Sequence, residues 1–242
     1  MNTVAVRERP ILFSGEMVRA ILDGRKSQTR RVLGVQPLEI LLPRDRRTKS
    51  FNAVTRVVDG RRAWFGLTHR DEKFDSLNRG VVFYCKYGEV GDRLWVREKC
   101  RLEWIEEDDV YWIRYAADDY LDEPPDVEGL TAWCERAKWA AGIEPGQEVT
   151  PWRLSIHMPR WASRLTLEIT EVRVQRVQEI GAPDLDAEGI TCRHCRNHGS
   201  RESGCTCRAL YQALWGSLNG KRGYGWDANP WVWAISFRRV EP

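Results

Sequence analysis

Four cysteines within sixteen residues restrict the fold of this chain more than any other feature of its sequence. Two residues separate Cys192 from Cys195, one residue separates Cys205 from Cys207, and a loop rich in Gly, Ser and Arg joins the two pairs. Sulfur ligands with this spacing fit a closed tetrahedral site, which leaves no open position for water or substrate. We therefore predict a zinc knuckle at 191–208, in which the four cysteines hold one structural zinc ion.

The same segment fits other chemistry as well. The gap between Cys205 and Cys207 is tighter than usual, so His194 or His198 is an alternative ligand in place of one thiol. Free or redox-active thiols and an iron–sulfur cluster are further interpretations. The other cysteines show no ligand spacing and are expected to be ordinary thiols: Cys85, Cys100 and Cys134.

Length and composition indicate a soluble globular protein. The chain has 242 residues, of which 42% are hydrophobic and 30% charged, and this balance argues against disorder. No apolar run approaches the roughly 18 residues that a membrane helix needs, and the first residues lack the apolar stretch of a secretory signal. Unpaired cysteines suit a reducing compartment. We expect a cytoplasmic monomer without a membrane partner.

Charge is distributed unevenly along the chain. Residues 1–50 carry 11 basic and 5 acidic side chains, residues 101–150 carry 4 and 14, and residues 151–242 carry 13 and 9. The two ends are therefore basic and the middle is acidic, which suits a polyanionic ligand held by the ends. An ordinary surface with scattered charges is the alternative.

Strand patterns dominate the chain. Residues 52–58 and 63–67 alternate weakly and predict exposed hairpins within an insertion at about 36–80. Trp231 and Trp233 are spaced by two residues, and we expect both to be buried. Further strands are predicted at 81–84, 94–96, 111–115, 161–177 and 231–240.

Two helices complete the predicted fold. Ser14 is a suitable N-cap for a helix at 15–23 that Gly24 ends, and a second helix is expected at about 209–218. We predict an α+β, β-rich fold, in which a small, mostly antiparallel barrel carries flanking helices and large loop insertions. The chain 1–242 is expected to be a single domain, with its second insertion at about 101–158.

A cluster of polar side chains follows the first helix. In an extended or turning segment, Lys26, Thr29 and Arg31 can bring an ammonium, a hydroxyl and a guanidinium to one mouth of a barrel, with Arg25 nearby. Such a cluster suits a phosphate or the polar edge of a base. A basic strand edge that deters aggregation is the alternative.

A second basic segment lies near the end of the chain. Lys221 and Arg222 stand beside Tyr224 and Trp226 in a glycine-rich loop. Aromatic planes next to cations suit stacked bases and their phosphates, so we expect these four side chains to face a ligand. The alternative for Trp226 is a ring that packs down onto the fold.

These segments together resemble the ASCH domain, a family of the PUA-like β-barrel superfamily. Gly24–Arg31 resembles the family's signature, Gly91–Val96 its GD-x-l-x-v turn and strand, and Glu171–Gly189 a strand and connector that end near an acidic residue. The closing sequence GYGWDANPWVWAISFRR is similar to the ends of bacteriophage and prophage members. The resemblance covers about 11–34, 81–100 and 160–242, and it implies a bacterial or phage-infected host cell.

The resemblance implies two classes of function. The first is binding of RNA, single-stranded DNA or a modified nucleoside in the basic mouth of the barrel. The second is hydrolysis of RNA or of an N4-acylated cytidine, because a small bacterial ASCH hydrolase of N4-acetylcytidine uses a Lys, a Thr and a Glu. Lys26 and Thr29 match its Lys-x-x-Thr spacing, and Glu188 is the best match to the glutamate.

If this chain acts as such a hydrolase, the resemblance implies that Thr29 is the nucleophile, Lys26 a partly desolvated base, and Glu188 an orienting group. We expect these three residues to lie outside the hydrophobic core. The chain is more than twice as long as a minimal ASCH domain, and its insertions can reshape the pocket, so binding is the first prediction and hydrolysis the alternative. Ligand contacts are expected from Arg25, Lys26, Arg31, Lys221, Arg222, Tyr224 and Trp226.

Overall fold

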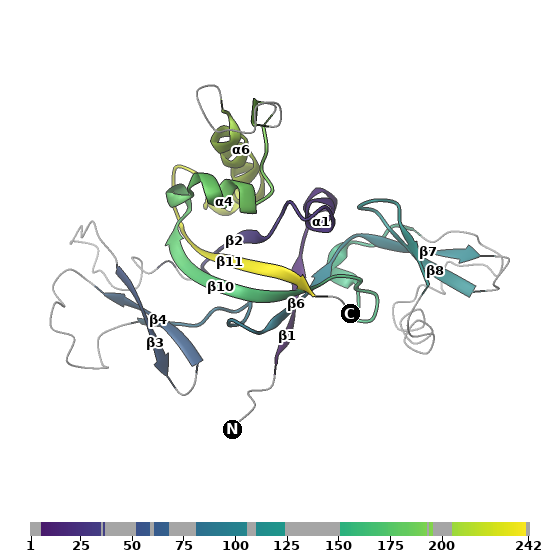
Figure 1. Ribbon diagram of the computed structural model, residues 1–242, viewed down its shortest axis with the longest axis horizontal. Helices are drawn as coiled ribbons and strands as arrows, with labels where there is room; N and C mark the ends of the chain where they lie inside the picture. Colours follow the sequence, from purple (N-terminus) through teal and green to yellow (C-terminus); the bar gives the residue numbers. More distant parts are fainter. Residues whose placement is uncertain are drawn as a thin grey trace. The chain divides into compact units, whose positions relative to one another are not determined.

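The computed structural model describes residues 6–34, 36, 52–58, 61–67, 81–105, 110–123, 151–192, 194–195 and 205–240. Cys134, His198 and residues 124–150 of the predicted acidic insertion lie outside these ranges. The chain divides into two compact units, and each is described by itself. Figure 1 labels the helices and strands.

Unit 1 comprises residues 1–24, 93–168 and 239–242. Strand β1 pairs in parallel with β6, and β6 pairs antiparallel with β10, while β7, β8 and β9 form a separate antiparallel sheet. The described elements of the unit are β1 (Glu8–Leu12), α1 (Gly15–Leu22), β6 (Arg93–Arg97), β7 (Cys100–Ile105), β8 (Val110–Tyr115), β9 (Leu121–Asp122), the 3-10 helix η2 (Ser155–His157) and the first residues of β10 (Thr166–Arg176).

Helix α1 begins and ends where the sequence predicts. The Ser14 hydroxyl accepts a hydrogen bond from the Met17 backbone N–H at 3.4 Å, which satisfies one of the free donors of the first turn. Gly24 follows the helix with a φ of +71°, a left-handed conformation that glycine adopts without strain. The buried side chains Val18 and Ile21 fix its inner face.

Unit 2 comprises residues 25–92 and 169–238. Strand β11 lies between β10 and β2, and pairs antiparallel with β2 from Val232 opposite Val32 to Ser236 opposite Gln28. Strands β3, β4 and β5 form an antiparallel sheet of their own. The elements of the unit are β2 (Gln28–Val32), β3 (Asn52–Val58), β4 (Arg61–Leu67), β5 (Val81–Phe83), the larger part of β10, η3 (Val177–Glu179), α4 (Ala182–Ala187), α6 (Cys207–Asn219), η4 (Gly220–Arg222) and β11 (Trp231–Val240).

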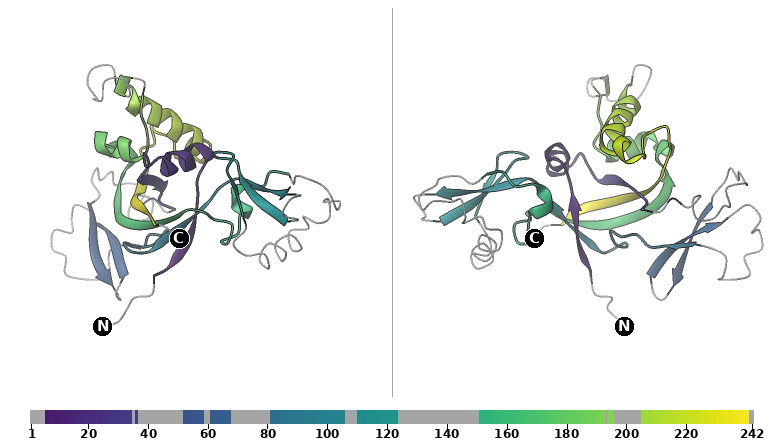
Figure 2. Two further views of the ribbon diagram at one scale, coloured as in Figure 1. Left: turned by 45° about the vertical axis from the view of Figure 1, so that its right-hand side comes forward. Right: turned by 180° about the vertical axis from the view of Figure 1, so that it is seen from behind.

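The helices of unit 2 enclose its hydrophobic core. Figures 1 and 2 show α4 and α6 on the same side of the long, bent strands β10 and β11. Trp231 and Trp233 of β11 are buried, as their spacing predicts. The buried residues between the helices and the strands are Val32, Val177, Ile180, Leu185, Cys192, Cys207, Tyr211, Trp215 and Val232.

The predicted fold class is confirmed, since the structure is α+β with mostly antiparallel strands. The helices at 15–23 and 209–218 and the strands predicted above are confirmed within a few residues, whereas β2, β7, β9 and α4 were not predicted as elements. Within the described residues no sheet closes into a barrel. No helix in this part of the chain combines the length and the apolar character needed to cross a bilayer.

Candidate functional site

The candidate site in unit 2 is centred on a buried ion pair between Lys26 and Glu188. The Lys26 ammonium donates to Oε2 of Glu188 at 2.7 Å and to the Glu188 backbone oxygen at 3.1 Å. The two side chains are exposed by only 1% and 6%. Two residues that were selected from distant segments of the sequence are thus in direct contact.

All three residues that the resemblance assigns to catalysis are buried. Lys26 is exposed by 4%, Thr29 by 3% and Glu188 by 8%. The expectation that they lie outside the core is therefore wrong. Its physical reason is that side chains on both faces of strand β2 are buried, and that α4 packs beside this strand.

Helix α4 provides two carboxylates for this site. The backbone N–H of Gly181 donates to Oδ2 of Asp184 at 3.2 Å, which satisfies a donor at the start of the helix. Glu188 caps the other end, and Gly189 stops the helix with a φ of +78°. Because residues four apart share one helix face, Asp184 and Glu188 point in the same direction.

Arg30 of strand β2 contacts both carboxylates. Its NH2 atom lies 2.8 Å from Oδ2 of Asp184, and its NH1 atom lies 3.2 Å from Oε1 of Glu188. NH1 also donates to Oε1 of Gln28 at 2.6 Å, and the Gln28 amide donates to Oδ1 of Asp184 at 3.2 Å. Gln28 and Arg30 share one face of the strand because side chains alternate along it. Each oxygen of Glu188 is therefore held by a different cation.

Sequence reasoning missed Gln28, Arg30 and Asp184. The polar residues Lys26, Gln28 and Arg30 repeat at the period of a strand, but the segment was not predicted to be one. Asp184 precedes Glu188 by one helical turn, and this spacing carries meaning only once α4 is known. Both signals depend on secondary structure that the apolar pattern does not reveal.

Burial controls the electrostatics of this cluster. Desolvation lowers the pKa of Lys26, and the neighbouring Glu188 carboxylate opposes that shift. Burial by itself raises the pKa of Asp184, but a hydrogen bond from Arg173, a backbone N–H and the charge of Arg30 outweigh it and lower the pKa to about 2. Asp184 is therefore ionised at neutral pH, and Lys26 releases its proton more readily than an exposed lysine.

Thr29 and Arg31 point to the opposite face of β2 from Arg30, because successive side chains alternate along a strand. Within the described residues, no hydrogen bond joins the Thr29 hydroxyl to Lys26 or Glu188. The structure thus brings together two of the three residues that the resemblance assigns to catalysis, and it places the third on the other face of the strand.

The segment between α6 and β11, residues 220–230, starts with η4 and is called the basic loop. It is held in a defined conformation. The Gln178 side chain donates to the Trp226 backbone oxygen at 2.9 Å, and the Gln178 backbone N–H donates to Oδ1 of Asn229 at 3.1 Å. Lys221 and Arg222 are exposed, as is Arg25 near β2, whereas Tyr224 and Trp226 are half-buried. The Arg222 guanidinium carbon lies 5.9 Å from the centre of the Tyr224 ring.

Tyr211 of helix α6 connects the basic loop to the ion cluster. Its ring packs edge-on against Trp226, with the ring centres 6.2 Å apart. Burial raises the pKa of its hydroxyl well above the usual value, the charge of Glu188 adds to this shift, and the positive charge of Arg30 opposes it. Tyr211 is therefore a protonated hydroxyl beside Arg30 at neutral pH.

The four cysteines of the predicted knuckle converge in unit 2. Their Sγ atoms all lie within 4.8 Å of one another, and the set consists of Cys192, Cys195, Cys205 and Cys207. The Sγ atom of Cys195 lies 3.3 Å from that of Cys205 and 3.7 Å from that of Cys207. A tetrahedral site with metal–sulfur bonds of about 2.3 Å places its sulfur atoms about 3.8 Å apart. The cluster therefore has the size of a four-thiolate metal site, and this part of the prediction is confirmed.

Backbone donors and a helix start surround part of the cysteine cluster. Backbone N–H groups donate to sulfur, from Cys192 to Cys207 at 3.1 Å and from Cys195 to Cys192 at 3.4 Å. Cys207 is the first residue of α6, where the positive end of the helix dipole stabilises negative charge. Among the described residues, His194 is not part of the converging set.

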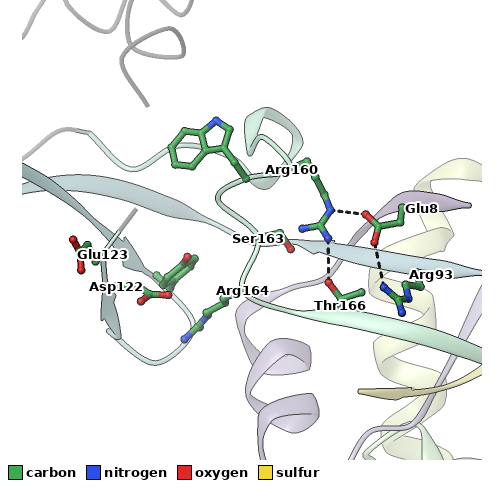
Figure 3. A pocket seen from close by; sticks show the side chains of 10 residues that line it. Glu8, Arg93, Asp122, Glu123, Arg160, Ser163, Arg164 and Thr166 are labelled. Carbon is green, nitrogen blue, oxygen red and sulfur yellow. Dashed lines mark hydrogen bonds and ion pairs between the residues drawn. The ribbon is translucent and has the colours of Figure 1, made fainter. Parts of the chain in front are cut away.

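Unit 1 contains a pocket of about 470 Å³ that none of the predicted site residues lines. In Figure 3, Arg160 and Arg93 approach Glu8 from two sides, at 2.8 Å and 4.0 Å, and Arg160 also donates to Thr166 at 3.3 Å. Arg164 also lines this pocket, and its ion pairs are with other residues of unit 1. Cations and carboxylates in this pocket largely neutralise each other, and so the candidate site remains the cluster of unit 2.

Unit 2 thus combines the buried ion pair of Lys26 and Glu188, a four-thiol cluster, and an exposed basic loop with an aromatic ring. Such an arrangement can hold a metal ion, bind phosphates and present polar groups to a base. Comparisons of the chain with protein-family models, with curated proteins and with solved structures found no match.

Proposed function

We propose that the chain binds nucleic acid or a modified nucleoside through unit 2, and that its sheets belong to a PUA-like barrel of the ASCH type. The observation that carries this proposal is the position of Tyr211, which packs on Trp226 of the basic loop and lies near enough to Glu188 and Arg30 of the buried cluster for their charges to shift its pKa. Two segments that were each expected to meet a ligand are thereby joined through one side chain.

The basic loop has the chemistry that phosphates and bases require. Lys221 and Arg222 are exposed and close to a half-buried ring, Tyr224, and the hydrogen bonds of Gln178 hold the loop in place. Cations neutralise phosphates without reading sequence, and an aromatic face accepts any base by stacking. A ligand at this loop would therefore be a single strand or a free nucleoside, rather than a duplex whose bases are covered.

Hydrolysis of an N4-acylated cytidine or of RNA is the second candidate. One observation favours it, namely the contact of Lys26 with Glu188, together with the burial that lowers the pKa of Lys26 and prepares it to accept a proton. Thr29 points to the face of β2 opposite Arg30, and among the described residues its hydroxyl makes no hydrogen bond with the expected base Lys26. Binding therefore remains the first proposal.

We further propose that the four cysteines hold zinc. Four sulfur ligands at a tetrahedral spacing match the structural sites that zinc prefers, and hard cations such as Mg²⁺ or Ca²⁺ avoid thiolates. With every position filled by sulfur, the ion would stabilise the fold and would leave no place for a reacting water molecule.

Fluorescence anisotropy with labelled RNA and labelled single-stranded DNA tests the binding proposal. Binding should be present at about 50 mM salt and weaken steeply by about 200 mM, because phosphate contacts release counterions. Lys221→Ala and Arg222→Ala should each reduce the slope of log affinity against log salt by about 0.7. Tyr224→Ala should cost about 1–3 kcal/mol of binding free energy, whereas Tyr224→Phe keeps the ring and should bind like the wild type.

The matched control is Lys86→Ala, which removes an exposed lysine of unit 2 that lies outside the basic loop. This variant should retain the wild-type slope. Calorimetry with N4-acetylcytidine forms a separate arm for a free nucleoside. An absence of binding to both polymers and to the nucleoside at low salt would contradict the proposal.

A further inference from the structure

The four-thiol cluster is connected to the Lys26–Glu188 pair by a short stretch of backbone. Three residues separate Glu188 from Cys192. Within this stretch, the Ile190 backbone N–H donates to the Leu185 oxygen at 2.9 Å, and so the chain folds back against α4. Cys192 then donates its own N–H to a sulfur of the cluster. The end of α4 is therefore fixed on one side by β2 and on the other by the thiols.

A second connection runs through helix α6. Cys207 is its first residue, and Tyr211 lies one helical turn later. Tyr211 packs in the same buried cluster as Leu185 of α4, and the charge of Glu188 at the end of α4 raises the pKa of its hydroxyl. The cysteine cluster is thus connected to Glu188 by two routes, one through the backbone that follows α4 and one through helix α6.

These connections belong to the core of the unit. Cys192 and Cys207 are buried in the same hydrophobic cluster as Leu185 of α4 and Tyr211 of α6. Interiors are close-packed, so a displacement of the thiols cannot be absorbed by empty space between the two helices. The position of α4 depends on what holds the cysteines together.

We propose that metal bound by the four cysteines positions Glu188 and thereby keeps Lys26 enclosed. The inference rests on the metal site of the proposed function and is independent of the ligand that the chain binds. Without the metal, the stretch between Glu188 and Cys192 loses its anchor. Movement of Glu188 leaves Lys26 and Arg30 as buried cations without their shared carboxylate, and an uncompensated buried charge draws water into the cluster.

Lysine acylation read by mass spectrometry tests this inference on the full chain. In the zinc-loaded protein Lys26 should react slowly, because its side chain is exposed by only 1%, whereas the exposed Lys221 of the same unit should react fully. Removal of the metal with a chelator, or the substitution Cys205→Ser, should raise the rate at Lys26 at least about tenfold and leave Lys221 unchanged. Cys205→His supplies another zinc ligand and should restore the protection of Lys26.

Two controls separate positioning from general unfolding. Cys85→Ala removes a buried thiol of unit 2 that is not in the cluster, and it should leave Lys26 protected. Hydrogen exchange should show that the β11 amides of Val232–Phe237 remain protected in Cys205→Ser while those of α4 exchange faster. The proposal is overturned if Lys26 stays protected without metal, if β11 opens together with α4, or if the purified chain contains no metal.

Discussion

Glu188 lies 162 residues from Lys26 in the sequence and accepts its ammonium at 2.7 Å in the structure. A buried ion pair of this kind is costly to desolvate, and it persists only where further hydrogen bonds satisfy both partners. Arg30 supplies one such bond, since it holds the second carboxylate oxygen at 3.2 Å. Glu188 is therefore the point at which two buried cations are neutralised together.

Substitution of Glu188 should destabilise unit 2 strongly. In Glu188→Gln, Lys26 and Arg30 remain buried without their shared negative charge, and we expect a loss of about 3–5 kcal/mol in the free energy of unfolding. Urea denaturation followed by circular dichroism measures this loss. The matched control is Glu171→Gln, which breaks the exposed pair with Arg173 in the same unit and should cost less than about 1 kcal/mol. Equal losses in the two variants would contradict the role of Glu188.

The sequence predicts which residues form strands and helices better than it predicts which of these elements contact one another. Trp231–Val240 was predicted at its observed limits, because a run of apolar and aromatic residues such as Trp231–Ile235 is typical of a buried strand. Strand β2 (Gln28–Val32) was not predicted, since Gln28 and Arg30 on one of its faces are polar or basic and yet buried. Their burial depends on carboxylates of α4, which no local pattern reveals.

Asp184 should make the stability of unit 2 sensitive to acid. Its folded-state pKa of about 2 lies below the ordinary 3.8, so its ionised form favours the folded state at any pH above about 4. This contribution is lost as the pH falls from about 4 towards about 2, because the unfolded chain then binds the proton first. Thermal melts across this range should show a flatter pH dependence in Asp184→Asn than in the wild type.

The control for this effect is Asp186→Asn, an exposed position on the same helix. It should keep the wild-type slope. If Asp184→Asn retained the same acid dependence as the wild type, the hydrogen bond from Arg173 and the charge of Arg30 would not be the cause of the low pKa.

Arg164 should be essential for the stability of unit 1. It donates to both oxygens of the buried Glu98, at 2.9 Å and 3.0 Å, and to both oxygens of Asp118, at 2.9 Å and 2.8 Å. Its guanidinium carbon also lies 4.1 Å from the centre of the Tyr115 ring. Arg164→Met strands the Glu98 carboxylate in the core, and we expect a loss of about 3–5 kcal/mol in the free energy of unfolding, measured by denaturation in urea.

The pH dependence of the stability of Arg164→Met shows whether the unpaired charge of Glu98 causes the loss. Burial already raises the pKa of Glu98, and removal of Arg164 takes away the charge that opposes this shift. A carboxyl whose folded-state pKa is raised favours the folded state at low pH, and this contribution is lost as the pH rises through its pKa. Arg164→Met should therefore be less destabilised at about pH 4 than at about pH 8, and adding Glu98→Gln should recover part of the loss. A loss that is independent of pH would contradict this account.

The four-cysteine site should contain about one zinc ion per chain. Elemental analysis of protein purified without chelators measures this content directly. Cys192→Ser should abolish it, because a three-sulfur site binds zinc much more weakly, whereas Cys100→Ala removes a buried thiol of unit 1 and should leave it unchanged. Iron in place of zinc, or metal-free protein with four titratable thiols, would contradict the assignment.

The cysteine site and the candidate catalytic residues differ in how far a sequence can specify them. Metal ligands are recognisable because the ion imposes a short spacing along the chain, and the four thiols converge as the pattern from Cys192 to Cys207 predicts. Lys26 and Glu188 lie far apart in the sequence with no such spacing between them, so only the resemblance to ASCH proteins selected them as a pair. Alternation along β2 then places Thr29 on the face opposite Arg30, and that orientation required knowledge of the strand.

The side-chain orientation of Thr29 provides the decisive test of hydrolysis. If its hydroxyl attacks the acyl group, Thr29→Ser should retain more turnover of N4-acetylcytidine than Thr29→Val, which keeps the buried shape but removes the hydroxyl, and the gap should be about 10²-fold or more. Acetate release, followed by chromatography, measures this turnover. Thermal melts of both variants serve as the control, since Thr29 is exposed by only 3% and either change could loosen the packing around β2. Equal turnover in the two variants would show that Thr29 is not the nucleophile, and it would favour a water molecule activated on the Lys26 side of the strand. Absence of turnover in the wild type, with nucleoside binding intact, would leave binding as the function of this site.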